Sequence, residues 1–491
     1  MTSGAADGGA VEAVGEHTGS FKRAFGLVDA VAVVVGSMIG SGIFIVSAET
    51  ARNVGSPGML LVCWVVAGLL TIIAALCYSE MAAMFPKAGG QYVFLREAYG
   101  PLWGFLYGWT LFLVIQSGTI AAVGVAFSKF FGVFVPAVSN TNILFSVGNW
   151  KFSAGQIVSV VLIAFLTWMN CRGVETGKKI QTSFTVAKVC AVAGLIVLGF
   201  LAFDKFNGLQ VNLAQFWNSV NDKGEALSGT GLILAMGLAM VGPLFACDAW
   251  NNITFAGEEV KDAEKILPRS LAVGTGLVVF LYLLANVAYL LLLPLHGTAD
   301  GATIVARGIT HATEDRVGTA AAEIIFGGPG KWIMAGAIMI STFGCLNGLI
   351  LAGARVYYAM AKDGLFFKKA AILNPVSNVP VFGLIIQGVW SAILATSGSY
   401  NQLLEYVMFT TLLFYLFSVA AVLTLRKKMP DVQRPYKVPL YPILPVLYLV
   451  ATVAIMVGQL WLSPGTTGAG LALVVLGVPV YFYLNRKRPA I

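Results

Sequence analysis

The sequence predicts an all-α integral membrane protein with twelve transmembrane helices. Of its 491 residues, 58% are hydrophobic and only 11% are charged, whereas a soluble domain is charged at about a quarter of its positions. Apolar runs of about 20 residues, long enough to cross ~30 Å of hydrocarbon as a helix, recur along the whole chain. The loops between these runs are short, so we expect residues 21–491 to form a single domain.

Twelve segments have the length and hydropathy of a membrane span. They are residues 26–50, 58–84, 98–131, 154–171, 179–203, 229–258, 270–294, 331–360, 380–397, 402–425, 441–461 and 467–485. We divide them into a first half of five spans (21–203), a second half of five spans (229–425) and a final pair (441–485).

The distribution of charge predicts which side of the membrane each segment occupies. Residues 1–20 are polar, rich in Gly and Ala and lack the features of a signal peptide, which predicts a disordered cytoplasmic tail. Most of the 31 Lys and Arg residues fall on the side of this tail, so the positive-inside rule places both termini in the cytoplasm. The net charge of +8 follows from this asymmetry and does not indicate a nucleic-acid partner.

The reactive residue types argue against an enzyme or a metalloprotein. The six cysteines lie in or beside apolar runs without paired spacing, and the three histidines fall outside the spans. This pattern predicts no disulfide framework, no metal site and no cofactor, and it lacks the clustered groups that a membrane enzyme requires. A channel would need a repeated filter or a polar ring, which the spans do not contain.

A glycine-rich stretch, "VVVGSMIGSGIF" (33–44), interrupts the first span. A phosphate-binding loop is excluded because no strand precedes it. Gly36 and Gly40 are four residues apart and could form a close helix-packing face. Gly42 lies off that face, however, and each glycine costs a helix about 1 kcal/mol relative to alanine. The stretch alone therefore leaves packing and unwinding both open.

A second interruption decides in favour of unwinding. The sixth span contains "MVGPLFACDAWNNITFAGE" (240–258), in which Gly-Pro is followed by Asp248, Asn251 and Asn252 at mid-membrane depth. Paired interruptions in matching spans of two halves indicate a transporter binding site at the interface of an inverted repeat. N–H groups freed at the start of one half-helix suit a carboxylate and carbonyls freed at the end of the other suit an ammonium group, so the pair fits a zwitterionic amino acid.

Two charged residues inside the spans need partners. Lys188, in the fifth span, would cost at least ~2.5 kcal/mol if it were unpaired; it either reaches the membrane interface or is held against the broken first helix. Asp248 could pair with Lys188, contact the substrate amine or bind backbone N–H groups in the break.

Three further residues at the two ends of the sixth-span break have two possible roles each. Glu258 and Glu259 could form a gate or a structural ion pair. Phe245 is either a core aromatic residue or a lid over the substrate.

Several segments together resemble a known family of transporters. They are "GSMIGSGIF" (36–44), "YSEMAAMFPKAGGQYVFLREAYGPLWGFLYGW" (78–109), "NCRGVETGKKIQTSFTVAKVCAV" (170–192), "FACDAWNNITFAGEEVKDAEKILPRS" (245–270), "FGCLNG" (343–348) and "MPDVQRPYKVPLYPILP" (429–445). The chain resembles the amino acid-polyamine-organocation superfamily and is most similar to its L-type amino acid transporter family. The resemblance implies a leucine-transporter-like fold with a five-plus-five inverted repeat, and sodium-independent transport of amino acids by alternating access.

The resemblance also implies roles for individual residues. The backbone of the first break is expected to bind the substrate carboxylate, the sixth span to line the amine and side-chain pockets with Phe245 as outer gate, and spans three and eight to complete the pocket. Lys188 matches a lysine that bridges the first and eighth helices, and it could serve as a coupling site or as a structural cation. The implied binding residues are Met38, Ile39, Gly40, Ser41, Gly42, Val114, Ile115, Thr119, Phe245, Ala246, Cys247, Asp248, Asn251, Ser341 and Cys345.

Two departures from the family pattern bear on the expected function. Animal relatives carry a glycine where Asp248 stands, and they bond a glycoprotein subunit through a cysteine in the loop after span three, which is absent here. We therefore expect a bacterial plasma-membrane transporter of neutral L-amino acids, working by exchange or facilitated flux without that subunit. A proton-coupled transporter of cationic amino acids or polyamines is the main alternative, and a receptor that binds amino acids without moving them is the third.

Overall fold

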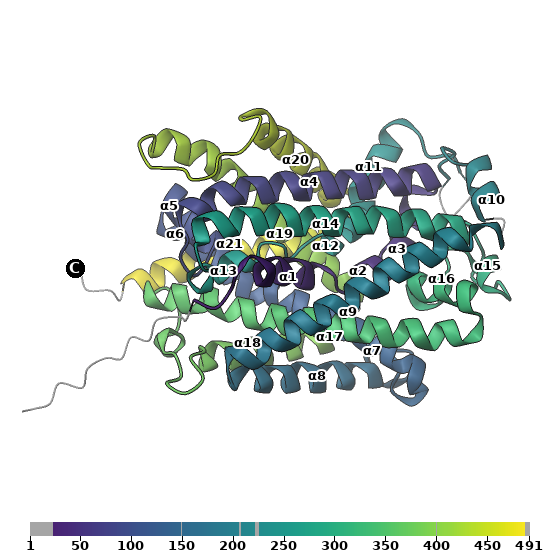
Figure 1. The fold of residues 1–491 in the computed structure, drawn as a ribbon, viewed down its shortest axis with the longest axis horizontal. Helices are drawn as coiled ribbons and strands as arrows, with labels where there is room; N and C mark the ends of the chain where they lie inside the picture. The colour runs from purple at the N-terminus through teal and green to yellow at the C-terminus, as the bar shows by residue number, and fades with distance from the viewer. Residues whose placement is uncertain (1–22, 149, 206–207, 221–224, 399, 487–491) are drawn as a thin grey trace, which may run out of the picture.

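A computed structural model describes residues 23–486 apart from 149, 206–207, 221–224 and 399, so the predicted tail lies outside the described residues. The described chain forms a bundle of roughly parallel and antiparallel helices (Figure 1). Within these ranges, eleven helices are long and apolar enough to cross a membrane, and the 17-residue helix Val381–Ser397 supplies a further, shorter one. Twelve predicted spans therefore correspond to twelve apolar helical segments.

The helices of the first half follow the predicted spans closely. They are α1 (Leu27–Met38), α2 (Gly42–Ile45), α3 (Ser47–Val54), α4 (Pro57–Met84), α5 (Gln91–Tyr99), α6 (Pro101–Thr110), the π-helix η1 (Leu111–Ile115), α7 (Gln116–Phe134), α8 (Ala154–Cys171) and α9 (Val174–Leu201). The third span begins at Pro101, three residues after its predicted start at residue 98. Gly100, with a φ of +104°, and Pro101 separate α5 from α6, because proline cannot continue the preceding helix.

The second half contains the second broken span. Its helices are α11 (Gly229–Ala239), α12 (Val241–Ala246), α13 (Asn252–Phe255), α14 (Ala263–Leu292), α17 (Gly328–Lys362), α18 (Val381–Ser397) and α19 (Tyr400–Lys428), followed by the final pair α20 (Ile443–Leu462) and α21 (Pro464–Arg486). Helix α14 begins seven residues before the predicted span at 270. Its first turns are polar, and hydropathy detects only the part of a helix that is apolar.

Matching helices of the two halves pack against one another. Helix α4 packs against α14, α7 against α17, and α8 against α18, while α1 contacts α13 and α2 contacts α12. Figure 1 shows α4 and α14 running alongside each other over most of their length. This is the pairing expected when two five-span halves form an inverted repeat. The residue limits of the two halves stay a prediction.

Several short elements were not predicted. They are the hairpin strands β1 (Ile143–Val147) and β2 (Trp150–Ser153), helices α10 (Gly208–Ala214), α15 (Ile304–Arg307) and α16 (Val317–Phe326), and the 3₁₀ helices η2 (Pro136–Val138), η3 (Phe203–Lys205), η4 (Gly257–Glu259), η5 (Thr313–Asp315) and η6 (Lys368–Ala371). All of them are shorter than a membrane span, and a search for spans does not detect such elements.

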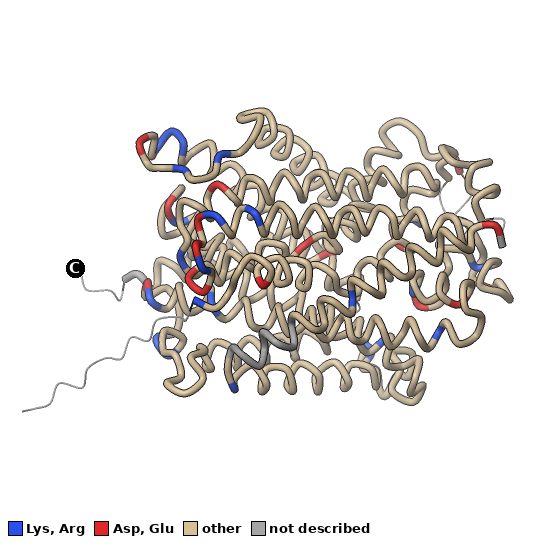
Figure 2. Tube along the Cα trace, in the orientation of Figure 1, with Lys and Arg blue, Asp and Glu red and all other residues tan. Residues whose placement is uncertain are grey.

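Charged residues are concentrated at one end of the bundle. Figure 2 shows most Lys and Arg residues at the left end, together with many acidic residues, where the described chain begins and α21 ends. The opposite end, with α10, α15 and α16, carries fewer basic residues. The asymmetry of basic residues seen along the sequence is therefore also an asymmetry in space.

A buried ion pair ties the end of the sixth span to α17. Arg355 on α17 places its Nε 2.5 Å from Oε1 of Glu259 and its Nη2 3.1 Å from Oε2, and both side chains are 2% exposed. The sequence predicted either a gate or a structural ion pair for Glu258 and Glu259. Glu259 forms an ion pair, whereas Glu258 is exposed. Such a pair contributes little net stability, but removing one partner leaves a buried charge uncompensated.

Replacing Arg355 with alanine is expected to destabilise the protein. The uncompensated Glu259 carboxylate should lower the free energy of unfolding by about 3–5 kcal/mol, which thermal unfolding of the purified protein in detergent can measure as a lower Tm. Lys369→Ala, at an exposed position on η6, is the matched control and should leave Tm unchanged. Equal Tm values for the two variants would contradict the assigned role of the pair.

Candidate functional site

The first break exposes five consecutive backbone carbonyls, and each has a donor from another helix. Helix α1 ends at Met38, and Ile39 is extended (φ −73°, ψ 93°) before α2 begins at Gly42. The donors are Lys188 Nζ to Gly36 O (2.7 Å) and Ile39 O (2.8 Å), Ser341 Oγ to Ile39 O (3.1 Å) and Gly40 O (3.2 Å), Cys345 Sγ to Ser37 O (3.1 Å), and Tyr282 OH to Met38 O (2.9 Å). The carbonyl side of the break is therefore satisfied.

Lys188 lies inside the protein and not at the membrane interface. Its side chain is 1% exposed, and its ammonium group lies between α9, which carries it, and the carbonyls of α1. Gly344 on α17 allows α9 to pack closely here, because a Cβ at that position would stand 2.8 Å from Cβ of Phe184. The sequence allowed Lys188 either to reach the membrane interface or to lie against the broken first helix, and the structure shows the second position. A role in coupling stays a prediction.

The N–H side of the first break is unsatisfied. Among the described residues, the N–H groups of Gly40, Ser41 and Gly42 have no hydrogen-bond acceptor, although all three residues are buried. The hydroxyl of Ser41 lies 3.3 Å from Tyr400 OH on α19. Buried N–H groups at the start of a helical segment attract an anionic acceptor, so this side of the break suits a carboxylate.

The second break presents the complementary groups. Helix α12 ends at Ala246, the chain runs through Ala249 with a φ of +66°, and α13 begins at Asn252. In the part of the chain that the structure describes, the carbonyls of Ala246, Cys247 and Asp248 accept no hydrogen bond. Free carbonyls at this depth suit an ammonium group.

The two breaks are in direct contact. A Cβ on Gly42 would lie 2.7 Å from Cβ and 2.8 Å from Cα of Ala246, and a Cβ on Gly40 would lie 3.1 Å from Cys345 Sγ. Any side chain at Gly42 would therefore push the two broken helices apart. The contact also means that the first span, the sixth span and α17 meet at the breaks, as the resemblance implies.

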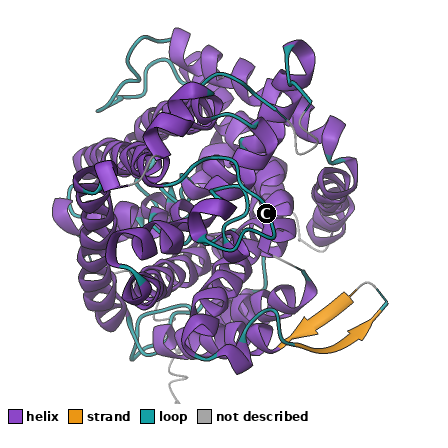
Figure 3. Cartoon of the chain, turned by 90° about the vertical axis from the view of Figure 1, so that its right-hand side faces the viewer, coloured by secondary structure: helices purple, strands orange, loops and turns teal. Residues whose placement is uncertain are grey.

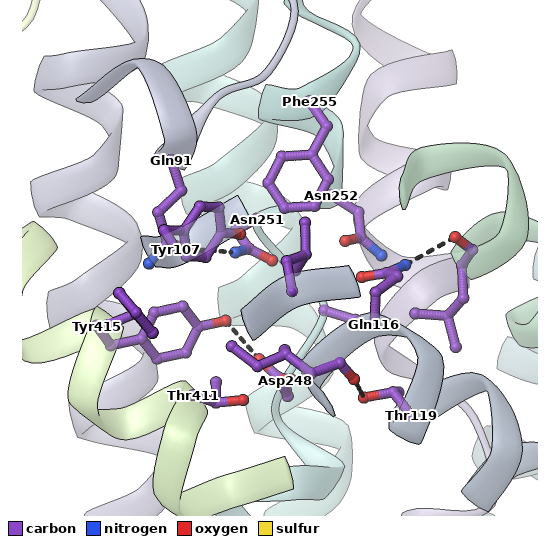
Figure 4. Close-up of a pocket in the computed structure, with 15 residues that line it drawn as sticks. Gln91, Tyr107, Gln116, Thr119, Asp248, Asn251, Asn252, Phe255, Thr411 and Tyr415 are labelled. Atoms are coloured by element: carbon purple, nitrogen blue, oxygen red, sulfur yellow. Dashed lines mark hydrogen bonds between the residues drawn. The ribbon is translucent and has the colours of Figure 1, made fainter. Parts of the chain in front are cut away.

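A small cavity of about 20 Å³, room for about one water molecule, lies beside the second break. Its lining includes the predicted residues Ile115, Thr119, Asp248 and Asn251, together with polar side chains from α5, α6, α7 and α19 (Figure 4). The predicted residue Val114 is buried on the π-helix η1 but does not line this cavity. The other predicted residues, on the first break, α12 and α17, lie around the contact between the two breaks and not in the cavity wall.

Asp248 is held by neutral donors. Tyr415 OH on α19 donates to its Oδ1 (Figure 4), and the backbone N–H of Ala249 donates to its carboxylate. Asp248 is 8% exposed, and no Lys or Arg of the described chain forms an ion pair with it. The proposed pairing with Lys188 is therefore wrong. The prediction that it binds a backbone N–H group is confirmed, and contact with a substrate amine stays a prediction.

Phe245 packs against an aromatic residue beside the breaks. Its ring meets that of Tyr400 edge to face, with centroids 6.2 Å apart, and Lys129 Nζ lies 5.4 Å from the centroid of the Tyr400 ring. Phe245 is 7% exposed. This geometry suits both a core residue and a lid, so its role as the outer gate stays a prediction.

Sequence reasoning did not identify several polar residues of the site. Gln116 donates to Leu349 O (2.7 Å), and Asn251 Nδ2 lies 3.3 Å from Gln91 Oε1 (Figure 4). Gln116 had a signal, since it stands inside the apolar run "LFLVIQSGT" (111–119) and polar residues within spans mark functional sites. Gln91 and Tyr415 gave no such signal. Gln91 lies on α5, a short helix outside the predicted spans, and Tyr415 could not be singled out because tyrosine is common in membrane spans.

Comparison with known proteins connects this geometry to a family. The family model described as "Amino acid permease" matches residues 25–479. The chain is 32% identical over 464 residues to "Large neutral amino acids transporter small subunit 2" of Homo sapiens, covering 94% of this chain and 80% of that protein. It is 29% identical to "Serine/threonine exchanger SteT" of Bacillus subtilis (95% and 98% covered) and to "Asc-type amino acid transporter 1" of Mus musculus (94% and 81% covered).

The contact between the breaks makes Gly42 a sharp test of the site. Gly42→Ala places a methyl group against Ala246, and overpacking of this kind costs about 1–3 kcal/mol. We expect uptake of radiolabelled substrate into proteoliposomes to fall by about tenfold or more. Gly276→Ala on α14 is the control, because a Cβ there meets nothing within 4 Å. Normal uptake by the Gly42 variant at equal protein content would contradict the assignment.

Removing the ammonium group of Lys188 tests the carbonyl side of the break. Lys188→Met keeps most of the side-chain volume but leaves Gly36 O and half of the acceptor capacity of Ile39 O without a donor, a cost of about 1–3 kcal/mol for each buried group. We expect a large loss of uptake and a lower Tm. Lys369→Met on the surface should change neither quantity, and similar values for both variants would refute a role in holding the break.

Proposed function

This chain belongs to the amino acid permease family, and from that premise we propose that it moves neutral L-amino acids across the membrane by alternating access, without sodium. The observation that carries the proposal is the juxtaposition of free N–H groups at residues 40–42 with free carbonyls at residues 246–248. The backbone of a zwitterionic amino acid has a carboxylate for the first set and an ammonium group for the second.

Independence from sodium is supported by Lys188. Its ammonium group already neutralises the carbonyls of Gly36 and Ile39 at 2.7 and 2.8 Å, which are oxygen ligands of the kind that a hard cation would use. A fixed positive charge at that place would repel a sodium ion. We therefore infer that Lys188 supplies the charge for which a sodium-coupled transporter would need an ion.

Exchange of neutral amino acids is supported by the relatives, and a preference among them is suggested by the cavity. The relatives at 29–32% identity are named as a large neutral amino acid transporter subunit, a serine/threonine exchanger and an Asc-type amino acid transporter. The cavity beside the second break is lined by Gln116, Thr119, Asn251 and Tyr415, among others, so it offers polar partners to a hydroxyl-bearing side chain. We infer a preference for small polar neutral amino acids over large apolar ones.

A proton-coupled transporter of cationic amino acids or polyamines is the second candidate. The observation that favours it is Asp248, a buried carboxyl group in the cavity wall without an ion-pair partner among the described residues. A carboxyl group in that position either binds a proton or awaits a cationic ligand. Its hydrogen bonds from Tyr415 and Ala249 favour the neutral-substrate proposal, because they satisfy the group without a cation.

The location of the protein, its need for a partner subunit and its lack of enzymatic activity are also inferred. We infer that this integral membrane protein resides in the plasma membrane with both termini in the cytoplasm, because the basic residues gather at the end where the described chain begins and ends. We infer that it works without a disulfide-linked glycoprotein subunit, because residues 135–152, between α7 and the start of α8, contain no cysteine. We infer that it carries out no catalysis, since the family members named above are transporters and exchangers.

A substrate panel in proteoliposomes tests the proposed function. We expect radiolabelled serine to exchange with internal serine or threonine, and arginine and spermidine to compete weakly. Replacing sodium with choline, or imposing a proton gradient, should leave uptake unchanged. Stronger competition by arginine than by serine would favour the second candidate, and saturable binding without uptake would indicate a receptor.

Asp248→Asn separates the two candidates further. If Asp248 only accepts hydrogen bonds from Tyr415 and the Ala249 N–H, the amide oxygen can replace it, and we expect serine exchange to fall by no more than about tenfold, the equivalent of one charge-assisted hydrogen bond. The control is Asp300→Asn, in an exposed loop. Selective loss of transport of arginine or spermidine in the Asp248 variant would contradict the neutral-substrate proposal.

A further inference from the structure

A β-hairpin projects from the bundle between α7 and α8. Strand β1 (Ile143–Val147) pairs antiparallel with β2 (Trp150–Ser153), and Figure 3 shows the pair extending outward from the rim of the helices. The hairpin lies at the end of the molecule opposite the concentration of basic residues. An isolated two-stranded hairpin is at best marginally stable in water, so its outward position raises the question of what it contacts.

The register of the hairpin makes it amphipathic. Phe145 pairs with Phe152 and Val147 pairs with Trp150, and because side chains alternate along a strand these four share one face. The rings of Phe145, Trp150 and Phe152 contact one another, with centroids 5.0–5.9 Å apart. The intervening pair, Ser146 and Lys151, points to the opposite face. Across these pairs one face is apolar and the other carries a cation, while the exposed Leu144 lies at the irregularity between Ile143 and Phe145.

Three of the four side chains on the apolar face are exposed, and Phe152 is partly buried. The exposed fractions of Val147, Phe145 and Trp150 are 67%, 49% and 38%. A contiguous exposed apolar patch of this kind marks an interaction site and not an ordinary water-facing surface.

The patch continues the surface that faces lipid. Ser153 leads directly into α8, a membrane-spanning helix whose Ile157, Val161, Phe165 and Trp168 are exposed along its length. At the other edge, Trp150 Nε1 donates to Thr396 O (2.7 Å) near the end of α18, whose Val389 and Ile393 are also exposed. The hairpin thus lies where the hydrocarbon-facing surfaces of two spans end, the level at which aromatic residues are enriched in membrane proteins.

The geometry points to a lipid anchor: the hairpin 143–153 lies in the bilayer interface at the outer end of α8, with Phe145, Val147, Trp150 and Phe152 against the acyl chains. Lys151, on the other face, lines a water-accessible hollow that it shares with Lys129 and Tyr400. The occupant of the apolar face is phospholipid, and neither a protein subunit nor a second copy of the chain is required.

Depth-dependent fluorescence quenching in nanodiscs that hold a single copy of the full chain tests this proposal. Phe145→Cys is labelled with the fluorophore NBD in a background in which Cys171 and Cys190, the cysteines that are not buried, are replaced with serine. The control is Ala302→Cys, an exposed position in the loop before α15 at the same end of the molecule. A third variant, Lys151→Cys, places the label on the opposite face of the hairpin. Each variant is first checked for an unchanged Tm.

We expect phosphatidylcholine that carries a nitroxide near the headgroup to quench the label at 145 at least about twofold more than the label at 302, and aqueous iodide to do the reverse. The label at 151 should be more accessible to iodide than the label at 145. Because each disc contains neither a partner protein nor a second copy, protection from iodide together with quenching by lipid can come only from the bilayer. Iodide quenching of 145 equal to that of 302, or shielding of 145 from both quenchers, would overturn the proposal.

Discussion

The structure depends on the contact between the Lys188 ammonium group and the carbonyls of Gly36 and Ile39, at 2.7 and 2.8 Å. A helix that unwinds inside a membrane must have its freed carbonyls satisfied by protein, because lipid offers no donors. A single positive charge satisfies two of them at once, and Ser341, Tyr282 and Cys345 supply donors to the others. These donors come from α9, α14 and α17, so three helices must pack around the break for it to exist.

The two breaks are satisfied in opposite ways, and this difference creates the site. At the first break the carbonyls are occupied and the N–H groups of Gly40, Ser41 and Gly42 are free; at the second, the carbonyls of residues 246–248 are free among the described groups. The side chain of Asp248, by contrast, is occupied by Tyr415 and the N–H of Ala249. Each break therefore leaves one kind of backbone group for a ligand, and the two kinds suit the two ends of a zwitterion.

Hydropathy predicted the spans, and Gly and Pro residues predicted where two of them break, because both signals are local in sequence. Lys188 was recognised as unusual, but its partners lie about 150 residues away, and nothing local distinguishes a lysine that binds carbonyls from one that reaches the interface. Tyr282 and Tyr415 resemble other tyrosines of apolar helices until the fold places them beside Met38 and Asp248. The hairpin at 143–153 was missed because its strands are short and its pairing depends on contacts across a turn.

The ion pairs at the two ends of the bundle bear on how the breaks can separate. At the end of the bundle away from most basic residues, Arg52 on α3 bonds Asp315 on η5 (2.8 Å) and the carbonyl of Thr310 (2.6 Å) at a partly exposed position. At the other end, Glu259 and Arg355 are almost fully buried. A pair that water partly reaches costs less to open than a buried pair, whose separated charges lose the compensation that the interior gave them. Because Gly42 and Ala246 are in contact, admitting a substrate requires one of these ends to open, and this comparison favours the end that carries Arg52 and Asp315.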